Sequence, residues 1–445
     1  MAERHLAILV GGGPAPGINS VISAAAIEAA SSGMRVTGLY DGLKRLLGDR
    51  FDQATHSVNL LSQDLDTVHF AGGSMIRTSR TNLLDEAKAH AGRMAPDRAK
   101  IRRVLGRLRK LGVSHLLTIG GGDTALSARL IADWAKGRIR VAHCPKTIDN
   151  DLPLADDMVT FGFSTARHNG AKIAQSLMDD ARTTRRWYVV VAMGRNAGFL
   201  ALGIGKAAGV TLTLIPEEFR EGVTLPQVAD VIEGAMLKRR ALGRRDGVVV
   251  VAEGLLYRMG GLEGIRRTLG RDVPLDAAGH LRLSEVPLAR LLRGELAKRY
   301  AERGDPITMV SETLGYELRS AAPTPFDMSY CRDLGHGAVR MLLDPDCPNA
   351  MATMKGGRIR PMPFDDMIDP KTGKTRVRLV NLASDEYRVA RAYRTRLEKR
   401  DLASRNKVAG MAKSAGMGRE EFLARFAPVV DGTICEAPPE DADIW

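Results

Sequence analysis

The chain has 445 residues, which is more than one hydrophobic core usually serves, so we expect two domains. Its hydrophobic content of 44% and charged content of 26% are ordinary for a globular protein and exclude a disordered class. The net charge of +13 would suit nucleic acid, but the basic residues are spread along the chain, so we expect no nucleic-acid partner.

The apolar runs are far too short to cross a bilayer, and no signal-like segment opens the chain. We therefore expect a cytoplasmic protein with no membrane contact. The four cysteines, Cys144, Cys331, Cys347 and Cys435, are widely scattered, and no C-x-x-C pair suggests a zinc or redox site. Reduced, mostly buried thiols are the expectation.

Short apolar or β-branched runs alternate with helical stretches along the chain. The runs that we expect to be strands are residues 6–10, 35–40, 115–119, 138–144, 187–192, 210–215, 247–252 and 307–311. This βαβ rhythm predicts an α/β fold with largely parallel sheets that helices cover on both faces.

Two basic tracts are expected to be helical. In residues 100–110, Ile101, Val104, Leu105 and Leu108 recur at helical spacing, so the basic residues between them should form the solvated face of an amphipathic helix. Residues 386–405 are also basic and helix-prone, whereas residues 436–445 are acidic and should be poorly ordered unless the terminal tryptophan docks.

Several loops that leave the expected strands combine glycine with polar or ionisable residues. In open α/β sheets, the carboxyl ends of the strands form the edge that binds ligands. The loops of this kind are residues 11–17, 72–80, 120–124, 145–151, 193–198 and 253–254.

The two glycine-rich loops of the N-terminal part each have two interpretations. Loop 11–17 precedes a helix, and it is either a phosphate-binding loop or a tight strand-to-helix turn. In loop 120–124, Asp123 is either the N-cap of the next helix, which the residues alone slightly favour, or a Mg²⁺ ligand that also excludes bulky groups.

Loop 145–151, with the sequence Pro-Lys-Thr-Ile-Asp-Asn-Asp, is the more specific signal. If the segment is extended, Asp149 and Asp151 point to similar sides and can divide base and metal or orienting duties. Lys146 supplies a compact positive charge for a moving phosphoryl group, and Thr147 can donate a hydrogen bond. The alternative interpretation is a solvated acidic turn.

Arginines gather in the remaining loops, and their planar guanidinium groups suit phosphate. Two anionic ligands are therefore plausible. The arginines in question are Arg77, Arg80, Arg182, Arg185, Arg186, Arg195 and Arg319.

Taken in order, five motifs resemble those of the phosphofructokinase family. They are residues 11–19, 120–124, 145–151, 193–195 and 314–319, and the resemblance spans roughly residues 5–385. It implies two Rossmann-like three-layer α/β/α domains with largely parallel sheets. A donor domain would comprise residues 1–165 and 317–385, and a sugar-phosphate domain residues 166–316 and 386–445, including a C-terminal helical extension.

The resemblance also implies roles for the reacting residues. Asp149 matches the general base that takes the proton from the 1-hydroxyl of fructose 6-phosphate, with Lys146, Thr147 and Asp151 supporting the transferring group. Arg80 would neutralise charge between donor and acceptor. The residues expected to line the donor phosphates are Gly12, Gly13, Gly121, Asp123, Thr124 and Lys146.

For the sugar phosphate, the same resemblance points to a second set of residues. Arg186 would reach the site of a neighbouring subunit, which implies a homodimer or homotetramer. The residues in contact with the sugar phosphate are expected to be Thr147, Asp149, Asp151, Arg186, Met193, Gly194, Arg195, Glu253, Tyr316 and Arg319.

The expected phosphoryl donor is pyrophosphate. Family members that use ATP commonly have glycine at the position of Asp123, and many have glycine at that of Lys146, whereas pyrophosphate-using members resemble this chain at both. An aspartate side chain intrudes where the α-phosphate of ATP would lie. Asp123 is also the expected Mg²⁺ ligand. It would hold the ion without an acidic neighbour, because Gly122 stands where the family usually has an acidic metal ligand.

The sequence thus predicts a reversible, Mg²⁺-dependent transfer from pyrophosphate to fructose 6-phosphate, in glycolysis and gluconeogenesis. Two alternatives stay open. One is an ATP-dependent phosphofructokinase, and the other is a non-catalytic, ligand-sensing subunit, which Gly122 makes conceivable but Lys146, Asp149 and Asp151 oppose.

Overall fold

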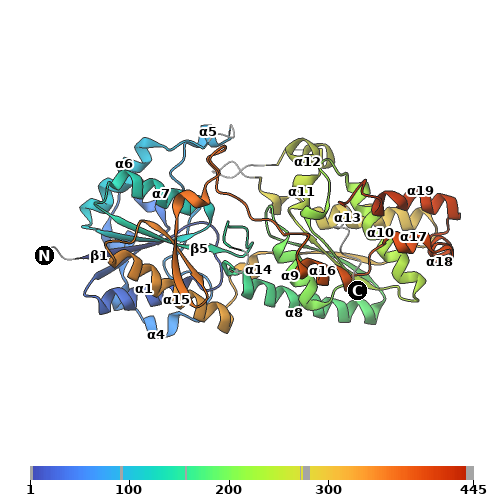
Figure 1. Cartoon of the computed structure of the whole chain (residues 1–445), viewed down its shortest axis with the longest axis horizontal. Coiled ribbons are helices and arrows are strands. Elements are labelled where there is room, and N and C mark those ends of the chain that lie inside the picture. Colours follow the sequence, from blue (N-terminus) through green and yellow to red (C-terminus); the bar gives the residue numbers. More distant parts are fainter. Residues whose placement is uncertain (1–3, 91–93, 156–157, 271, 274–280, 437–445) are drawn as a thin grey trace. The chain divides into compact units, whose positions relative to one another are not determined.

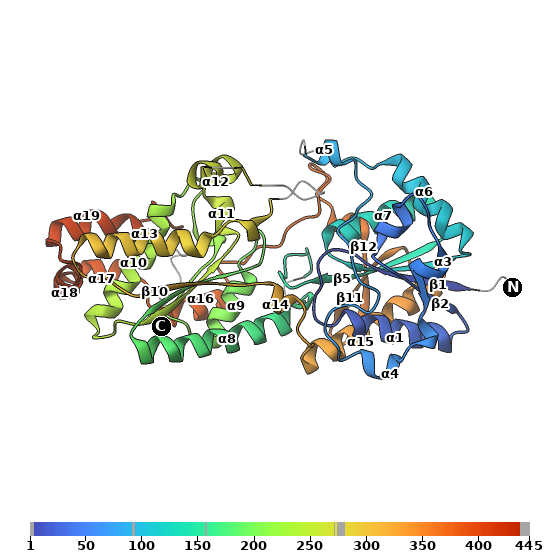
Figure 2. The same ribbon diagram turned by 180° about the vertical axis from the view of Figure 1, so that it is seen from behind.

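The computed structural model describes residues 4–90, 94–155, 158–270, 272–273 and 281–436 (Figures 1 and 2). Its described residues divide into two compact units. The first contains the residues up to Ala166 together with Tyr316–Arg378, and the second contains the residues from Arg167 to 273, then Leu281–Gly315, then those from Leu379 onward. Each unit is built around its own sheet.

The sheet of the first unit has the strand order β12-β11-β5-β4-β1-β2-β3, and β6 pairs with the end of β5. The pairings are parallel except those of β2 with β3 and of β11 with β12, which are antiparallel. The strands are β1 (His5–Val10), β2 (Arg35–Leu39), β3 (Ser57–Asn59), β4 (His115–Gly120), β5 (Arg140–Thr147), β6 (Phe161–Gly162), β11 (Ala350–Lys355) and β12 (Arg358–Pro363).

Alternation along β1 shows why this sheet is covered on both faces. Leu6, Ile8 and Val10 belong to the core formed with α1 (Ile18–Ser31) and α15 (Pro325–Leu343). Ala7 and Leu9 belong to the core formed with α6 (Arg98–Lys110) and α7 (Gly122–Ala135). Since successive side chains of a strand point to opposite faces, a strand that is apolar throughout needs helices on both sides. Figure 1 shows α6 and α7 on one side of the sheet and α1 and α15 on the other.

The helices of the first unit follow the pattern expected for parallel strands. They are α1 (Ile18–Ser31), α2 (Leu43–Leu47), α3 (Gln53–His56), α4 (Leu65–Val68), α5 (Glu86–His90), α6 (Arg98–Lys110), α7 (Gly122–Ala135), α14 (Tyr316–Arg319) and α15 (Pro325–Leu343), with 3-10 turns at η1 (Leu60–Ser62) and η4 (Phe364–Met367). Helix α8 (Phe163–Thr184) begins in this unit and continues into the second.

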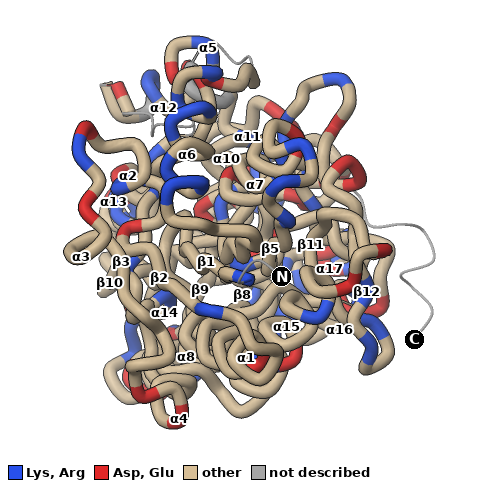
Figure 3. The backbone as a smooth tube through the Cα atoms, turned by 90° about the vertical axis from the view of Figure 1, so that its left-hand side faces the viewer, with Lys and Arg blue, Asp and Glu red and all other residues tan. Residues whose placement is uncertain are grey.

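The prediction of an amphipathic helix in residues 100–110 is confirmed by α6. Its four apolar residues at helical spacing are all buried. Figure 3 shows the basic positions along this helix in blue. Arg103 and Arg107 donate hydrogen bonds to backbone carbonyls at the end of α2, including those of Leu47 at 2.9 Å and Leu46 at 2.8 Å. Part of the basic charge therefore caps a neighbouring helix.

The second unit contains a smaller sheet in which all strand pairs are parallel, in the order β10-β7-β9-β8. The strands are β7 (Trp187–Ala192), β8 (Leu212–Leu214), β9 (Gly247–Ala252) and β10 (Met309–Leu314). Strands β7 and β9 are buried throughout, because helices pack on both faces.

Helix α9 packs on one face of this sheet, and α10 and α13 belong to the core on the other. The helices of the second unit after α8 are α9 (Phe199–Ala208), α10 (Leu225–Ala241), α11 (Leu255–Arg258), α12 (Gly261–Leu269), α13 (Leu288–Glu302), α16 (Asp385–Ala392), α17 (Lys399–Ala403), α18 (Arg405–Ala415) and α19 (Arg419–Val430), with 3-10 turns at η2 (Pro216–Glu218) and η3 (Leu283–Glu285).

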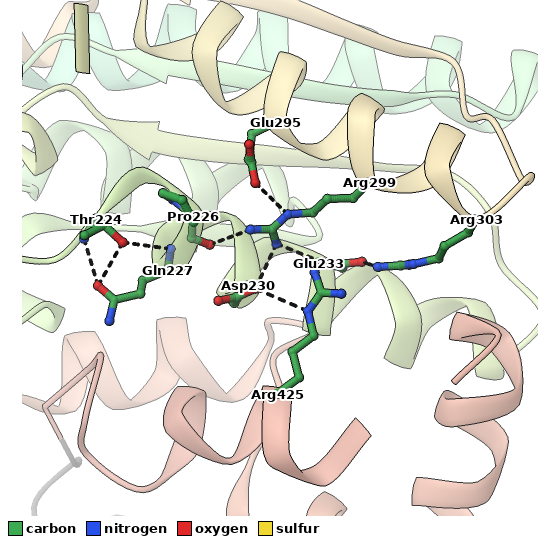
Figure 4. Close-up of polar contacts among 9 residues, drawn as sticks. All are labelled: Thr224, Pro226, Gln227, Asp230, Glu233, Glu295, Arg299, Arg303 and Arg425. Carbon is green, nitrogen blue, oxygen red and sulfur yellow. Dashed lines mark hydrogen bonds and ion pairs between the residues drawn. The ribbon is translucent and has the colours of Figure 1, made fainter. Parts of the chain in front are cut away.

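The C-terminal helices α18 and α19 pack against α10 through both apolar and charged contacts. In Figure 4, arginines from α13 and α19 converge on two acidic residues of α10. The fully buried carboxylate of Glu233 accepts hydrogen bonds from Arg299 at 2.9 Å, from Arg425 at 2.6 Å and from Arg303. Asp230 accepts a further bond from Arg299 at 2.8 Å. The ion pair between Arg425 and Glu233 thus helps to hold α19 of the C-terminal extension against α10.

All eight runs expected to be strands contain strands, with boundaries shifted by a few residues. The basic tract 386–405 is helical only in part, because the chain leaves α16 and turns inward before α17. There, Arg394 and Arg396 are buried and both pair with the buried Glu218, at 2.6 and 2.7 Å. Residues 437–445, for which the sequence suggested poor order, lie outside the described part of the chain.

The expected cysteine state agrees with the structure. All four cysteines are free, and Cys144, Cys331 and Cys435 are buried. Within the described ranges, none of the helices combines the length and the apolar character needed to cross a bilayer.

Candidate active site

Loop 11–17 joins β1 to α1 and fits tightly against neighbouring loops of the first unit. Its Gly11 amide donates to the carbonyl of Ile119 at 2.8 Å, and its Gly12 amide to that of Ser79 at 2.8 Å. Gly12 has a φ of +83°, which favours glycine, and a Cβ atom there would lie 3.2 Å from Lys146 Nζ. Glycine therefore lets the backbone approach the lysine closely.

Lys146 lies near the end of β5 and is only 4% exposed. Its ammonium group donates a hydrogen bond to the carbonyl of Gly13. Burying an ammonium group is costly unless it is paired or hydrogen-bonded, so a buried lysine on a glycine loop is a position at which an anion would be favoured. The structure thus brings Lys146 together with the expected donor residues Gly12 and Gly13.

Loop 120–124 leads from β4 into α7, and Gly121 is the N-cap residue of that helix. The slightly favoured interpretation of Asp123 as the cap is therefore wrong. The run of three glycines lets the helix begin before the aspartate, which falls in the first turn, where a negative charge suits the helix dipole. Thr124 packs so closely on Gly11 that a Cβ atom there would lie 2.3 Å from its hydroxyl oxygen.

Gly122, which by the resemblance stands where an acidic residue is usual, lies against Thr375. A Cβ atom at Gly122 would lie 3.0 Å from the Thr375 hydroxyl oxygen and 3.1 Å from its Cβ. The Thr375 hydroxyl also donates to the Gly122 carbonyl at 3.4 Å. The space that an acidic side chain would need is therefore partly taken by a residue 253 positions later.

Loop 145–151 is extended only as far as Thr147, the last residue of β5. Asn150 has a φ of +56°, in the left-handed region, so the chain bends between the two aspartates. The expectation that this segment is extended through Asp151 is therefore wrong, and an extended chain gives no ground for placing Asp149 and Asp151 on similar sides. Asp149 is 4% exposed, and its amide donates to the hydroxyl of Thr147 at 3.0 Å.

The other expected residues of the first unit lie around these loops. Arg80 follows Ser79, whose carbonyl accepts the Gly12 amide, and its side chain is exposed. Arg319 lies in the short helix α14, and its guanidinium is 2.9 Å from where a Cβ atom on Gly13 would be. Tyr316, in the same helix, is 64% exposed.

In the second unit, four of the expected sugar-phosphate residues, Met193, Gly194, Arg195 and Glu253, lie together at loop 193–198. One oxygen of the buried Glu253 carboxylate accepts the amides of Gly194, at 3.1 Å, and Arg195, at 3.0 Å. The Met193 side chain packs on Gly315, where a Cβ atom would lie 2.4 Å from it. The loop backbone is thus held by a carboxylate.

Arg186 lies just before β7. Its side chain donates to the hydroxyl of Thr184 and lies 3.4 Å from the Asp180 carboxylate. A third of the side chain is exposed.

Comparison with known proteins accounts for this arrangement of loops. A family model described as Phosphofructokinase matches residues 5–342, which is more than half of the chain. The chain belongs to the phosphofructokinase family.

Relatives within the phosphofructokinase family match almost the whole chain. A protein of Thermotoga maritima named pyrophosphate–fructose 6-phosphate 1-phosphotransferase is 51% identical over 96% of this chain and 98% of its own length. A protein of Naegleria fowleri with the same name is 43% identical over 96% and 95%. An ATP-dependent 6-phosphofructokinase of Corynebacterium efficiens is 32% identical over 83% and 94%.

A solved structure supports the phosphofructokinase fold. The pyrophosphate-dependent phosphofructokinase of Marinobacter aquaeolei superimposes with a TM-score of 0.64 at 16% identity, over 86% of this chain and 88% of that one. At this identity, the likeness shows the fold alone. The expectation of a phosphofructokinase α/β fold is confirmed.

Two residues that hold these phosphofructokinase loops had no signal in the sequence. Arg378 donates to backbone carbonyls around loop 145–151, among them that of Met158 at 2.8 Å. The buried Glu217 accepts the Gly198 amide at 2.9 Å and the Val380 amide at 3.0 Å. Burial raises the pKa of Glu217 above its ordinary value, although these amides act in the opposite direction. Neither residue lies in a recognisable motif.

The first unit offers residues that fit a divalent cation. Mg²⁺ in phosphoryl-transfer sites is commonly held by one or two carboxylates together with substrate phosphates and water, so a dense cage of protein ligands is not required. Asp123 supplies such a carboxylate next to a helix N-terminus that suits phosphate. In the described part of the chain, no three His, Cys, Asp or Glu side chains are grouped so as to hold a metal alone.

Proposed function

We propose that this chain transfers a phosphoryl group reversibly from pyrophosphate to the 1-hydroxyl of fructose 6-phosphate. The products are fructose 1,6-bisphosphate and phosphate. The observation that carries the proposal is the 51% identity, over 98% of the relative's length, to a protein named for this reaction. The ATP-dependent 6-phosphofructokinase of Corynebacterium efficiens is 32% identical.

The donor loops support pyrophosphate on physical grounds. Asp123 in the first turn of α7 puts a negative side chain beside the helix end that would receive phosphate. A chain of three phosphates with a nucleoside meets repulsion and lost space there, whereas a diphosphate is short enough to avoid both. The buried ammonium of Lys146, beside Gly12 and Gly13, offers a positive charge to the compact anion.

Asp149 is the proposed general base. It takes the proton of the 1-hydroxyl while the hydroxyl oxygen attacks the nearer phosphorus of pyrophosphate, and the bond to the bridging oxygen breaks to release phosphate. Thr147 and Asp151 support the transferring group, and Arg80 and Lys146 offset the negative charge that develops on it. Gly121 and Thr124 complete the donor site.

The sugar phosphate is proposed to bind through Met193, Gly194, Arg195 and Glu253, with Tyr316 and Arg319 on its phosphate. The hydrogen bonds from loop 193–198 to Glu253 support this proposal, because a loop whose backbone is held can present its side chains in one geometry.

A divalent cation, proposed to be Mg²⁺, would be held by Asp123 and would supply Lewis-acid stabilisation of the diphosphate charge when bound. We further propose a homodimer or homotetramer in which Arg186 serves a neighbouring site, and a cytoplasmic location. The four free cysteines are in keeping with a reducing compartment.

The test is a donor assay with purified protein in both directions. We expect turnover with pyrophosphate and Mg²⁺, the reverse reaction with phosphate and fructose 1,6-bisphosphate, and at least about a hundredfold lower kcat/KM with ATP. Asp123→Gly should reduce the difference in kcat/KM between pyrophosphate and ATP, because it removes the side chain that is proposed to exclude ATP. Efficient turnover of the unchanged protein with ATP and none with pyrophosphate would overturn the donor assignment.

A further inference from the structure

The guanidinium group of Arg378 lies among the backbone carbonyls of Asn150, Leu154, Ala155 and Met158 in the first unit. Its Nη1 donates to the carbonyls of Met158 at 2.8 Å, Ala155 at 3.0 Å and Leu154 at 3.4 Å. Its Nε and Nη2 donate to the carbonyl of Asn150 at 3.2 and 3.1 Å. All three nitrogens of the group are therefore used on one short stretch of chain.

The same arginine fixes the side chain and backbone next to Asp149. Nη2 also donates to Asn150 Oδ1, and the Arg378 amide donates to the carbonyl of Asp151 at 2.8 Å. Asn150 Oδ1 in turn accepts the amide of Thr160 at 3.0 Å. Asn150 is thus held in its left-handed conformation by bonds to its side chain and its carbonyl.

A second set of bonds closes the other side of the loop. The Thr160 hydroxyl donates to the carbonyl of Thr147 at 2.7 Å, and the Thr147 hydroxyl accepts the amide of Asp149 at 3.0 Å. The bonds therefore run from Arg378 through Asn150 and Thr160 to Thr147, and Asp149 lies between the two fixed ends.

The two residues next to Arg378 are apolar but exposed, and Val380 is the nearest buried apolar residue after it. The neighbours of Arg378 in sequence, Val377 and Leu379, are 44% and 45% exposed. Arg378 thus makes its contacts inward between two exposed apolar residues, which is the reverse of the usual preference. Its hydrogen bonds are the contacts that hold this arginine inward.

We infer that Arg378 is a positioning residue that sets the direction of the Asp149 carboxylate through Asn150. The inference rests on the proposed role of Asp149 as base. A guanidinium is suited to this task, since its five N–H donors point outward in one plane and can bond several carbonyls at once. Lysine has a single nitrogen and cannot reproduce the arrangement.

Arg140 provides a matched control. It is the first residue of β5, the strand whose other end leads into the loop that contains Asp149. Its guanidinium donates to the carbonyls of Pro345, Met341, Asp344 and Cys347 near the end of α15. It holds backbone in the same unit in the same way, but at the amino end of β5. A purely structural effect of losing such an arginine should therefore be similar at both positions.

The experiment compares Arg378→Ala, Arg378→Lys and Arg140→Ala in the full chain, with steady-state kinetics and melting temperatures. For Arg378→Ala we expect kcat to fall about tenfold to a hundredfold, with a smaller change in KM for fructose 6-phosphate, because a displaced base slows the chemical step. Arg140→Ala should keep kcat within about threefold of the unchanged protein at temperatures where it is folded.

Chemical rescue separates positioning from folding. Guanidinium chloride, well below denaturing concentrations, should restore part of the kcat of Arg378→Ala, whereas sodium chloride at the same ionic strength should not. If Arg378→Ala does not fold, Arg378→Lys is used to test the inference, and we expect its kcat to be at least about fivefold lower than that of the unchanged protein.

The inference is overturned if the folded Arg378 variant keeps kcat within about twofold of the unchanged protein, or loses no more than Arg140→Ala does. Absence of rescue in a folded Arg378→Ala with low kcat would also count against it. Asp149→Asn tests the proposed base separately. If Asp149→Asn retains turnover, the proposed base role of Asp149 is wrong, whatever the result for Arg378. If the unchanged protein uses ATP and not pyrophosphate, the Arg378 and Arg140 variants are compared with ATP as the donor.

Discussion

The buried charge cluster of the second unit yields a stability prediction whose size follows from its geometry. Replacing Glu233 by Gln keeps the shape of the side chain but removes the negative charge that three arginines share. The substitution also places the NH₂ group of glutamine next to guanidinium groups, and both can only donate hydrogen bonds. Removing one partner of a buried ionic cluster costs about 3–5 kcal/mol, and the retained amide oxygen places our expectation near the lower value, about 3 kcal/mol.

The surroundings of the cluster support this size. Glu233 has no exposed side-chain surface, and Arg299 is 11% exposed. Burial raises the pKa of Asp230 even though Arg299 and Arg425 favour its charged form. The Asp230 side chain is 18% exposed, so little solvent is available to replace a lost partner. Without the Glu233 carboxylate, its three arginine partners would therefore be poorly compensated in the folded state, which lowers the free energy of unfolding.

The assay is thermal unfolding followed by calorimetry, with hydrogen exchange read over α13 and α19. For a unit of this size, about 1 kcal/mol corresponds to roughly 2–4 °C, so Glu233→Gln should melt about 10 °C lower. The exchange rate should rise in α19, which Arg425 ties to α10.

Glu302→Gln is the control for this measurement. Glu302 and Lys298 form an exposed pair at 3.9 Å, so losing it should cost less than about 1 kcal/mol. If Glu233→Gln melts within the range of this control, or if α19 exchanges as before, the cluster does not hold the C-terminal helices and the reasoning is wrong.

Two further predictions concern acid and the glycine before Asp123. Burial raises the pKa of Glu218, but Arg396 and neighbouring arginines outweigh it and lower that pKa from 4.5 to about 2. The stability from this pairing is therefore fully present above pH 4.5 and is lost as the pH falls towards 2, by about 3 kcal/mol, and Glu218→Gln should flatten this part of the pH–melting curve. Gly122→Asp should lower turnover without lowering the Mg²⁺ concentration needed for half-maximal rate, because its Cβ meets Thr375 at 3.0 Å; a tighter Mg²⁺ dependence would contradict this.

The sequence alone predicted the parts of the fold that depend on local patterns. Strand β7 is a continuous run of apolar residues, and α6 repeats its apolar residues at helical spacing, so each could be recognised from a short window. The loops at the carboxyl ends of the strands were found for the same reason, since glycine and ionisable residues directly follow an apolar run.

Contacts between distant residues were out of reach of this reasoning. Arg378 meets Asn150 across 228 positions, and Arg396 meets Glu218 across 178. An arginine has the same appearance in a sequence whether it is solvated or buried, because its environment is decided by the packing of other segments. The conformation of Asn150 was missed similarly, since asparagine is common in both extended and left-handed backbone.

Loops 145–151 and 193–198, which are proposed to bind the reactants, share a physical problem that explains why charged residues hold them. A loop at a sheet edge has backbone groups that no neighbouring strand can pair, and burying such groups without partners is costly. Glu253 satisfies two amides of loop 193–198, and Arg378 satisfies the carbonyls of Asn150 and Asp151. Charged partners give short, directional bonds, so they fix where a neighbouring side chain points more closely than apolar contact does. Substitutions at these residues should therefore alter turnover more than their contribution to stability alone would predict.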